Sequence, residues 1–487
     1  MRVNRRYHFV FMRDAAGLSA ILVLAGSVAL MAQAQNPTSA ANPFLGSVTA
    51  QPATGEALKL SLDDAVERGL KNNLGLKEAE NEEVSLHGEK NQVLQEFLPT
   101  IALTGDTGYY IHDLAVFGFN SHTLQEIASG SGGTLLSGLS IINEDYLTDG
   151  QIHYNQILFS GPVIAGWKAA GAAERASYFS KMSARGEVIQ RVATAYLRAI
   201  ADQSEVANAQ ALVAQAQTLE DHTHAAHEAG TAANLDELRA RVQLEAQQQA
   251  LIATENQQAK DLILLKREIG IAPGQTIELI DPAPYSELAE QTPEELRAIA
   301  YKSRKDYQNL QNQVAEYKAI HSAYRSQRLP TLSFNSYYGT STVNGVGTHG
   351  NFAAVGTLSF PLFREARLRG DEDASQAQLN AVSAQFADLR DRIDEQVRAA
   401  LLDVNANKQL VDVARSNVDL ATRALSDETD RVNAGVDDNL PLVTAQATLA
   451  TAESNLVESL YQYNVSKLLL ARAAGVLEQQ YRVYLGR

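Results

Sequence analysis

The sequence predicts an α+β membrane protein, in which long coiled-coil helices and four transmembrane β-strands are arranged in two internal repeats. Three observations lead to this prediction. An export signal opens the chain, a set of residues recurs at a nearly constant offset, and four short segments alternate apolar and polar side chains.

Composition excludes several classes of protein. The 487 residues include no Cys and carry a formal net charge of −16. The chain therefore has no disulfide, no thiolate metal site and no lipidated N-terminal cysteine. Its acidic balance argues against a nucleic-acid partner, which needs a basic face. No nucleophile elbow, phosphate-binding loop or metalloprotease spacing is present, so we expect neither an enzyme nor a bound cofactor.

The N-terminus has the pattern of an export signal. Arginines precede an apolar run from Ala15 to Met31, after which Ala32 and Ala34 flank Gln33 as a small-x-small cleavage site. We predict a signal peptide over residues 1–34 and an extended segment over 35–57, the alternative being a retained transmembrane anchor. No later stretch has the roughly 18 uninterrupted apolar residues that a transmembrane helix requires.

The rest of the chain is a tandem duplication. Ser61 and Thr292, both typical helix N-caps, are 231 positions apart, and the Leu-Pro-Thr segments at 98–100 and 329–331 share this offset. Later the offset is 205, as between the Asn-Leu pairs at 234–235 and 439–440. The first repeat therefore has roughly 26 additional residues, which belong most simply to a long first loop over 112–145. We predict a first repeat over 58–270, a linker over 271–291, a second repeat over 292–477 and a tail over 478–487.

Each repeat is expected to contain the same elements. Two shorter helices end at a proline, two strands follow, and a very long helix turns at a glycine into a helix of about half its length. The long helices carry valines at heptad spacing, as at 397, 404, 411 and 418, which indicates coiled-coil packing. The expected strands are 100–111, 150–159, 332–341 and 351–360; the expected long helices are 163–229, 235–269, 365–434 and 440–474.

The four strand segments have one apolar and one polar face. In the first, Ile101 and Leu103 alternate with Ala102 and Thr104. This pattern suits a transmembrane strand, although a half-buried sheet in a soluble protein shows it equally. Export, and the lack of another sheet to cover the apolar face, favour the membrane. Because four strands cannot close a barrel and lipid tolerates no open edge, several copies must assemble.

The ordered set of motifs resembles the TolC-like outer membrane efflux proteins. The resemblance covers residues 58–477 and rests on the duplicated plan, the Leu-Pro-Thr segments, Gln-Ile-Leu-Phe-Ser-Gly at 156–161 and Ser-Phe-Pro-Leu-Phe at 359–363. It implies a homotrimer with a 12-stranded β-barrel in outer-membrane lipid, four strands from each copy, and a periplasmic α-barrel. It also implies a periplasmic adaptor and an inner-membrane pump, for which this chain would be the passive exit duct in efflux or type I secretion. The alternative is a periplasmic coiled-coil scaffold or adaptor.

The family resemblance implies that the turns between the long helices are functional sites. Family members close the periplasmic end there, often with acidic residues, which makes Asp236, Asp437 and Asp438 candidates for a gate. The turn residues Gly230 and Gly435, with Asn234 and Asn439, are candidates for adaptor contact. The alternative is local helix chemistry: Asn234 would cap its helix, and Asp236 would favour the helix dipole.

A histidine cluster precedes the first turn. His224 and His227 share a helix face, whereas His222 points away from His224, so three ligands for a metal are awkward to assemble. We expect a solvated segment and no metal, with His224 and His227 as the weak candidates for metal ligands. The sequence does not identify the cargo.

Overall fold

The computed structural model describes residues 42–48, 52–113, 142–230, 233–282, 285–343, 347–434 and 439–486. The expected signal peptide lies outside the described residues. The chain forms two compact units. Of the described residues, those within His87–Ala172 and Ala315–Asn380 form the strand unit, and those within 42–86, Ala173–Val314 and 381–486 form the helical unit.

Both repeats open with a helix held by a capping box, as expected. Helix α2 (Leu62–Asn72) follows Ser61, whose hydroxyl accepts the Asp64 backbone N–H at 3.1 Å. Helix α7 (Pro293–Ser303) follows Thr292, which pairs in the same way with the third helical residue. These contacts satisfy backbone donors that a helix start leaves free. The next helices, α3 (Leu74–Gln95) and α8 (Lys305–Ser326), each end four residues before the proline at which they were expected to stop, in a turn that leads to it.

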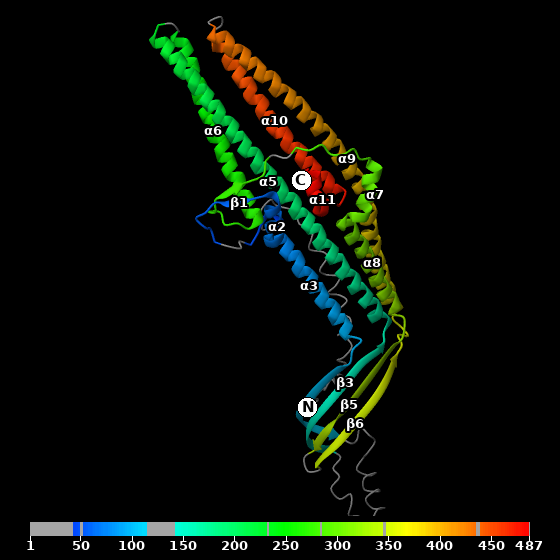
Figure 1. The fold of residues 1–487 in the computed structure, drawn as a ribbon. Coiled ribbons are helices and arrows are strands. Elements are labelled where there is room, and N and C mark those ends of the chain that lie inside the picture. The colour runs from blue at the N-terminus through cyan, green and yellow to red at the C-terminus, as the bar shows by residue number, and fades with distance from the viewer. Residues whose placement is uncertain are drawn as a thin grey trace, which may run out of the picture. The chain divides into compact units, whose positions relative to one another are not determined.

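The long helices occupy nearly the expected ranges (Figure 1). They are α5 (Gly161–Glu228), α6 (Asn234–Ile269), α9 (Glu365–Asn433) and α10 (Asn439–Ala473). Their heptad positions form the core of the helical unit: Val188, Val397 and Val411 are fully buried together with Tyr196 and Tyr463. The coiled-coil seam predicted from the sequence is thus confirmed, and burial of this apolar stripe stabilises helices of this length.

Four small elements of the helical unit were not expected. Strand β1 (Leu58–Leu60) pairs in parallel with β4 (Ile277–Leu279), which lies in the region expected to be a plain linker. The segment expected to be a tail forms helix α11 (Leu477–Tyr484), which buries its apolar side. A 3-10 turn, η1 (Pro43–Leu45), lies in the segment expected to be extended. Elements of three residues are too short to show a hydrophobic period, and α11 continues directly after the repeat.

The strand unit contains one antiparallel sheet in the order β2-β3-β5-β6. Its strands are β2 (Thr100–Asp113), β3 (Ile142–Phe159), β5 (Thr331–Val343) and β6 (Gly347–Ser359). Strand β3 begins eight residues earlier than the expected start at 150, because its pairing with β2 continues to Asp113. The first loop is correspondingly shorter than expected and lies outside the described residues. Among the described helices, none has a segment both long and apolar enough to span a membrane.

Candidate functional site

The sheet of the strand unit has one continuous apolar face. Leu103 lies opposite Ile152, Ile152 opposite Tyr338, and Tyr338 opposite Phe352, so that one row crosses all four strands. All four side chains are at least half exposed, and Leu103 is 81% exposed. Nothing in the described chain covers this row. Exposed apolar area on this scale marks a surface that meets lipid or another protein.

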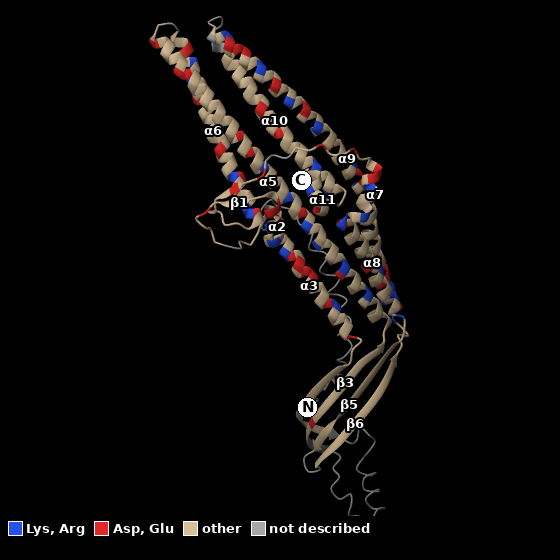
Figure 2. Cartoon of the chain, viewed as in Figure 1, with Lys and Arg blue, Asp and Glu red and all other residues tan. Residues whose placement is uncertain are grey.

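The opposite face of the sheet is polar. The row beside the apolar one contains Thr104, Gln151 and Asn351, joined through Gly339. Figure 2 shows how charged residues are spread along the helices, whereas β5 and β6 contain no Asp, Glu, Lys or Arg. The register therefore aligns an apolar row on one side of the sheet and a polar row on the other, as a transmembrane barrel wall requires.

Both outer strands of the sheet have an unpaired edge. Strand β2 pairs only with β3, and β6 pairs only with β5, within the described chain. Each edge therefore presents a row of backbone N–H and C=O groups without strand partners. Such edges are unfavourable in water and far more so in lipid, where no solvent replaces the missing hydrogen bonds.

The long helices also carry a second apolar stripe, apart from the buried seam. On α9 the stripe contains Leu410, Val413 and Leu420, which are all exposed. On α6 an equivalent stripe of exposed residues runs along most of the helix, at Leu235, Leu238, Val242, Ile252 and Ile263. The spacings in both stripes fit alternating steps of three and four residues. A helix with two heptad stripes is built to contact neighbours on two sides.

The first helical tip is the turn between α5 and α6. Gly230 has a φ of 72°, the left-handed conformation that ends a helix, and its N–H donates to His227 O at 2.9 Å. The expected cap was wrong: the N-cap of α6 is Ala233, which makes no side-chain cap, and Asn234 is the first helical residue. Asp236 forms an ion pair with Arg239 at 3.4 Å. The carboxylate proposed for a gate is thus already paired within its own helix.

The two candidate histidines converge on a single carboxylate. Glu237 Oε1 lies 2.8 Å from His224 Nδ1, and its Oε2 lies 3.7 Å from His227 Nε2. The hydrogen bond to Glu237, assisted by the charge of Glu228, raises the pKa of His224. Among the residues that the structure describes, no three His, Asp or Glu side chains are arranged to hold a metal ion. The cluster ties the last turn of α5 to the first turn of α6.

Part of the second tip lies outside the described residues, including Gly435, Asp437 and Asp438. Asn439 is the first residue of α10. Behind the tips, Leu219 of α5, Ala240 of α6 and Leu442 of α10 form one buried apolar cluster. The two helical hairpins therefore pack against each other near their ends within one chain.

A buried acidic cluster in the helical unit was missed by the sequence analysis. Asp202, which interrupts the heptad seam of α5, is 3% exposed, and its Oδ1 lies 3.0 Å from Arg198 Nε. Arg198 also reaches Glu458 at 3.0 Å and Asp261 at 3.8 Å. Burial, together with the hydrogen bond and the charge of Asp261, raises the pKa of Asp202 to about 7. The break in the heptad pattern was the only signal in the sequence.

A buried lysine fixes the segment between the repeats. Lys467 of α10 has no exposed surface, and its Nζ donates to Ser286 O at 3.2 Å. The same ammonium group lies 4.6 Å from the centre of the Tyr463 ring. Burial lowers the pKa of Lys467 to about 8. These contacts give the linker a defined path across α10.

Comparisons with known proteins agree with this architecture. Over residues 65–270 and 296–476 the sequence matches the family described as outer membrane efflux protein. A search of curated proteins found no match.

Solved structures with a similar fold include a membrane protein from Pseudomonas aeruginosa, at a TM-score of 0.70 and 19% identity, over 85% of this chain and 93% of that chain. They also include the outer membrane channel CmeC of Campylobacter jejuni, at a TM-score of 0.70 and 15% identity, over 89% and 92% of the two chains. The outer-membrane channel OprN has a TM-score of 0.71 and 16% identity, over 85% of this chain and 89% of that chain. The chain belongs to the outer membrane efflux protein family.

Proposed function

We propose that three copies of this chain form an outer-membrane exit duct for a tripartite efflux or type I secretion system. The observation that carries the proposal is the sheet with one exposed apolar face and two unpaired edges. Joining β6 of each copy to β2 of the next satisfies both edges. Two copies would give an eight-stranded barrel filled by its own side chains, so three copies are the smallest number that leaves a pore.

The second apolar stripe supports the same assembly for the helices. Leu410, Val413 and Leu420 would pack against a neighbouring copy and continue the helical hairpins into a closed α-barrel. Full burial of such side chains contributes roughly 1.5–3 kcal/mol each, so burying the exposed half of three of them contributes a few kcal/mol per interface. A barrel of this kind would carry cargo from the tips to the strands.

Transport through this duct would be passive. The sequence contains no nucleotide-binding motif, so energy would come from an inner-membrane pump connected by a periplasmic adaptor. The adaptor would contact the tip turns at Gly230 and Gly435, with Asn234 and Asn439 beside them. Drugs, metal ions and other small molecules are all compatible with a polar inner wall.

The proposal is tested by placing charge on either face of the sheet. Leu103→Asp with Phe352→Asp puts two carboxylates on the apolar row, and Thr104→Asp with Asn351→Asp puts them on the polar row one residue away. We expect the first pair to abolish insertion into lipid bilayers, and the second to insert as trimers that conduct with greater cation selectivity. A periplasmic scaffold would be favoured if the two pairs of substitutions had the same effect. It would also be favoured if neither the variants nor the wild type formed discrete channels.

The gate forms a separate part of the proposal. Three copies of Asp437 and Asp438, with Asp236 as a second candidate, would make acidic rings at the tips that favour cations. Alanine at Asp437 and Asp438 should raise single-channel conductance and weaken block by divalent cations. Unchanged conductance and unchanged block would remove these residues from the gate. Asp236→Ala should have the smaller effect, because Asp236 is paired with Arg239.

A further inference from the structure

The connection from strand to long helix differs between the two repeats. In the first repeat, one residue separates the end of β3 at Phe159 from the start of α5. In the second repeat, five residues, 360–364, separate β6 from α9. Two of these, Leu362 and Phe363, are 87% and 97% exposed, more than any other large apolar side chain in the described chain. The longer connection thus holds two apolar side chains away from the protein.

The exposed pair follows the apolar face of the sheet in sequence. Phe352 and Leu358 share the even positions that face one side of β6, and both are exposed. Phe360, the first residue after the strand, is exposed as well, and Leu362 and Phe363 come two and three residues later. Because the proposed barrel faces lipid on this side, the pair lies where the lipid surface would end and the helical part begins.

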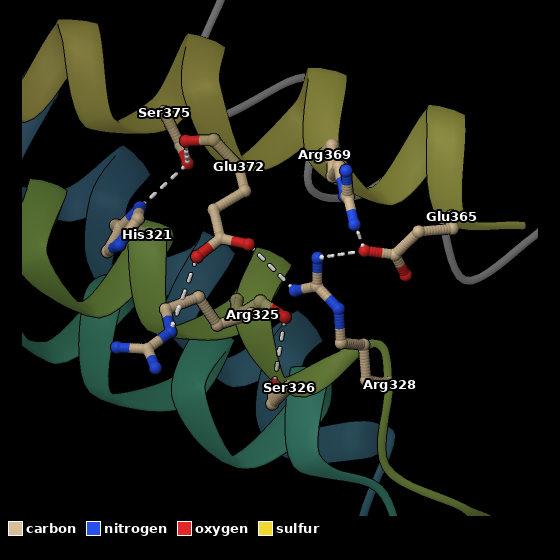
Figure 3. Close-up of polar contacts among 9 residues, drawn as sticks. His321, Arg325, Ser326, Arg328, Glu365, Arg369, Glu372 and Ser375 are labelled. Carbon is tan, nitrogen blue, oxygen red and sulfur yellow. Dashed lines mark hydrogen bonds and ion pairs between the residues drawn. The ribbon is translucent and has the colours of Figure 1, made fainter.

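Positive charge follows the apolar pair directly. Arg364 and Arg367 are exposed; Arg367 has only a loose contact with Asp371 at 3.7 Å, and the Arg364 guanidinium contacts no polar group that the structure describes. The neighbouring arginines are engaged: Figure 3 shows Arg328 and Arg369 both meeting Glu365, with Arg328 also bound to Glu372 at 2.7 Å. This network fixes the start of α9 and leaves Arg364 and Arg367 available to an anion.

A similar combination occurs at the start of the first long helix. Ile164, Trp167 and Lys168 are neighbours on one side of the first turns of α5 in the strand unit. All three are exposed, and Trp167 is the only tryptophan of the chain. Tryptophan beside a long basic side chain is typical of the boundary between membrane and water.

We propose that Leu362 and Phe363 insert into the periplasm-facing surface of the membrane, and that Arg364 and Arg367 bind the phosphate groups of anionic phospholipids there. The inference rests on the proposed membrane duct. A lipid fits better than a second copy of the chain, because Leu362 and Phe363 come directly after a strand whose apolar side faces lipid in the proposed barrel. Apolar side chains followed by guanidinium groups match the order of acyl chain and headgroup in a phospholipid.

Tryptophan fluorescence tests the insertion. In a Trp167→Phe background, Phe363→Trp places the sole fluorophore at the proposed anchor, while Leu358→Trp marks the sheet and Gln378→Trp marks an exposed position further along α9. Each trimer is reconstituted in vesicles that contain phospholipids brominated on their acyl chains, and iodide is added to the water. We expect brominated lipid to quench the fluorophore at positions 358 and 363 alone, and iodide to quench it at position 378 alone.

The headgroup preference provides the second measurement. Brominated phosphatidylglycerol should quench the Phe363→Trp variant about threefold more efficiently than brominated phosphatidylcholine at equal content, because two guanidinium groups attract the anionic lipid. Adding Arg364→Gln and Arg367→Gln should make the two lipids equal. The matched pair Arg392→Gln and Arg423→Gln, exposed on α9 in the helical unit, should leave the preference intact.

The outcomes separate the inference from the proposed function. If brominated lipid quenches the fluorophore at position 358 but not at 363, the proposed membrane insertion of Leu362 and Phe363 is wrong and the proposed duct is unaffected. In that case, iodide quenching at position 363 means that the side chain is exposed to water. Protection of position 363 from both quenchers means that it contacts another copy of the chain. An equal response to both brominated lipids in the Phe363→Trp variant with its native arginines overturns the phosphate contact. Absence of quenching at position 358 overturns the membrane duct and the anchor together.

Discussion

Replacing Asp202 by Asn should stabilise the protein at neutral pH and change little in mild acid. Asp202 is buried in the α5 seam, and the titratable and charged groups that face it are Arg198 and Glu205 on α5, Asp261 on α6 and Glu458 on α10. Asparagine has nearly the shape of a protonated aspartic acid. It can accept a hydrogen bond from Arg198 and donate one toward Asp261, so the packing of the seam should be retained.

The magnitude follows from the raised pKa of Asp202. A carboxyl group with a pKa of about 7 in the folded protein, against an ordinary value of 3.8, binds a proton more tightly when folded. Stability therefore falls as pH rises from about 4 to about 7, and at higher pH the ionised form costs about 4 kcal/mol relative to the protonated form. Asparagine avoids this cost, while Arg198 keeps its contacts with Glu458 and Asp261.

The assay is urea unfolding of the detergent-solubilised protein, followed by far-UV circular dichroism at about pH 4 and about pH 8. We expect Asp202→Asn to gain about 2–4 kcal/mol at the higher pH and less than about 1 kcal/mol at the lower. The control is Asp419→Asn on α9, where the carboxylate is exposed and paired with Arg423 at 2.6 Å, and where less than about 0.5 kcal/mol is expected at either pH. A gain that is equal at both pH values, or a loss at the higher one, would refute the reasoning.

Three further predictions concern other parts of the helical unit. Gly475→Ala should lower the unfolding temperature much more than Gly230→Ala. Both glycines have a positive φ, but an added Cβ at Gly475 would lie 2.6 Å from the backbone nitrogen of Arg304, whereas one at Gly230 would meet nothing within 4 Å. Equal shifts in unfolding temperature would exclude this steric effect. Glu237→Gln should lower the pKa of His224 in a histidine NMR titration, and an unchanged pKa would show that Glu237 does not raise it. Tyr196→Phe should cost about 1–3 kcal/mol in urea unfolding, because the buried hydroxyl bonds to a strand carbonyl and a carboxylate; full stability would mean that water replaces these bonds.

The strands illustrate which structural features can be predicted from the sequence alone and which cannot. Alternation placed Leu103 and Phe352 on apolar faces, and the register later set them in one row with Ile152 and Tyr338. Periodicity determines which face a side chain occupies, but it does not determine which residues of two strands lie opposite each other. For the same reason, alternation located each strand but not the early start of β3 at Ile142, where pairing partners extend it.

The parts that the sequence did not reveal depend on tertiary contacts. Ala233 is the N-cap of α6 although Asn234 has the better capping side chain, so local preference did not locate the start of this helix. Asp261 is an ordinary polar residue in its own helix and becomes part of the acidic cluster only because α6 packs against α5 beside Asp202. A single sequence shows local preference and period; it does not show which distant carboxylates share a buried site.

The unlike edges of the sheet have a consequence for mixed populations of chains. Because β6 of one copy has to meet β2 of the next, a chain with one damaged edge still joins the proposed trimer through its intact edge and then prevents the ring from closing. If such a chain is made in equal amount with the wild type and mixes at random, roughly one trimer in eight contains wild-type chains alone. An edge mutation should therefore be genetically dominant, whereas loss of the whole strand unit should be recessive.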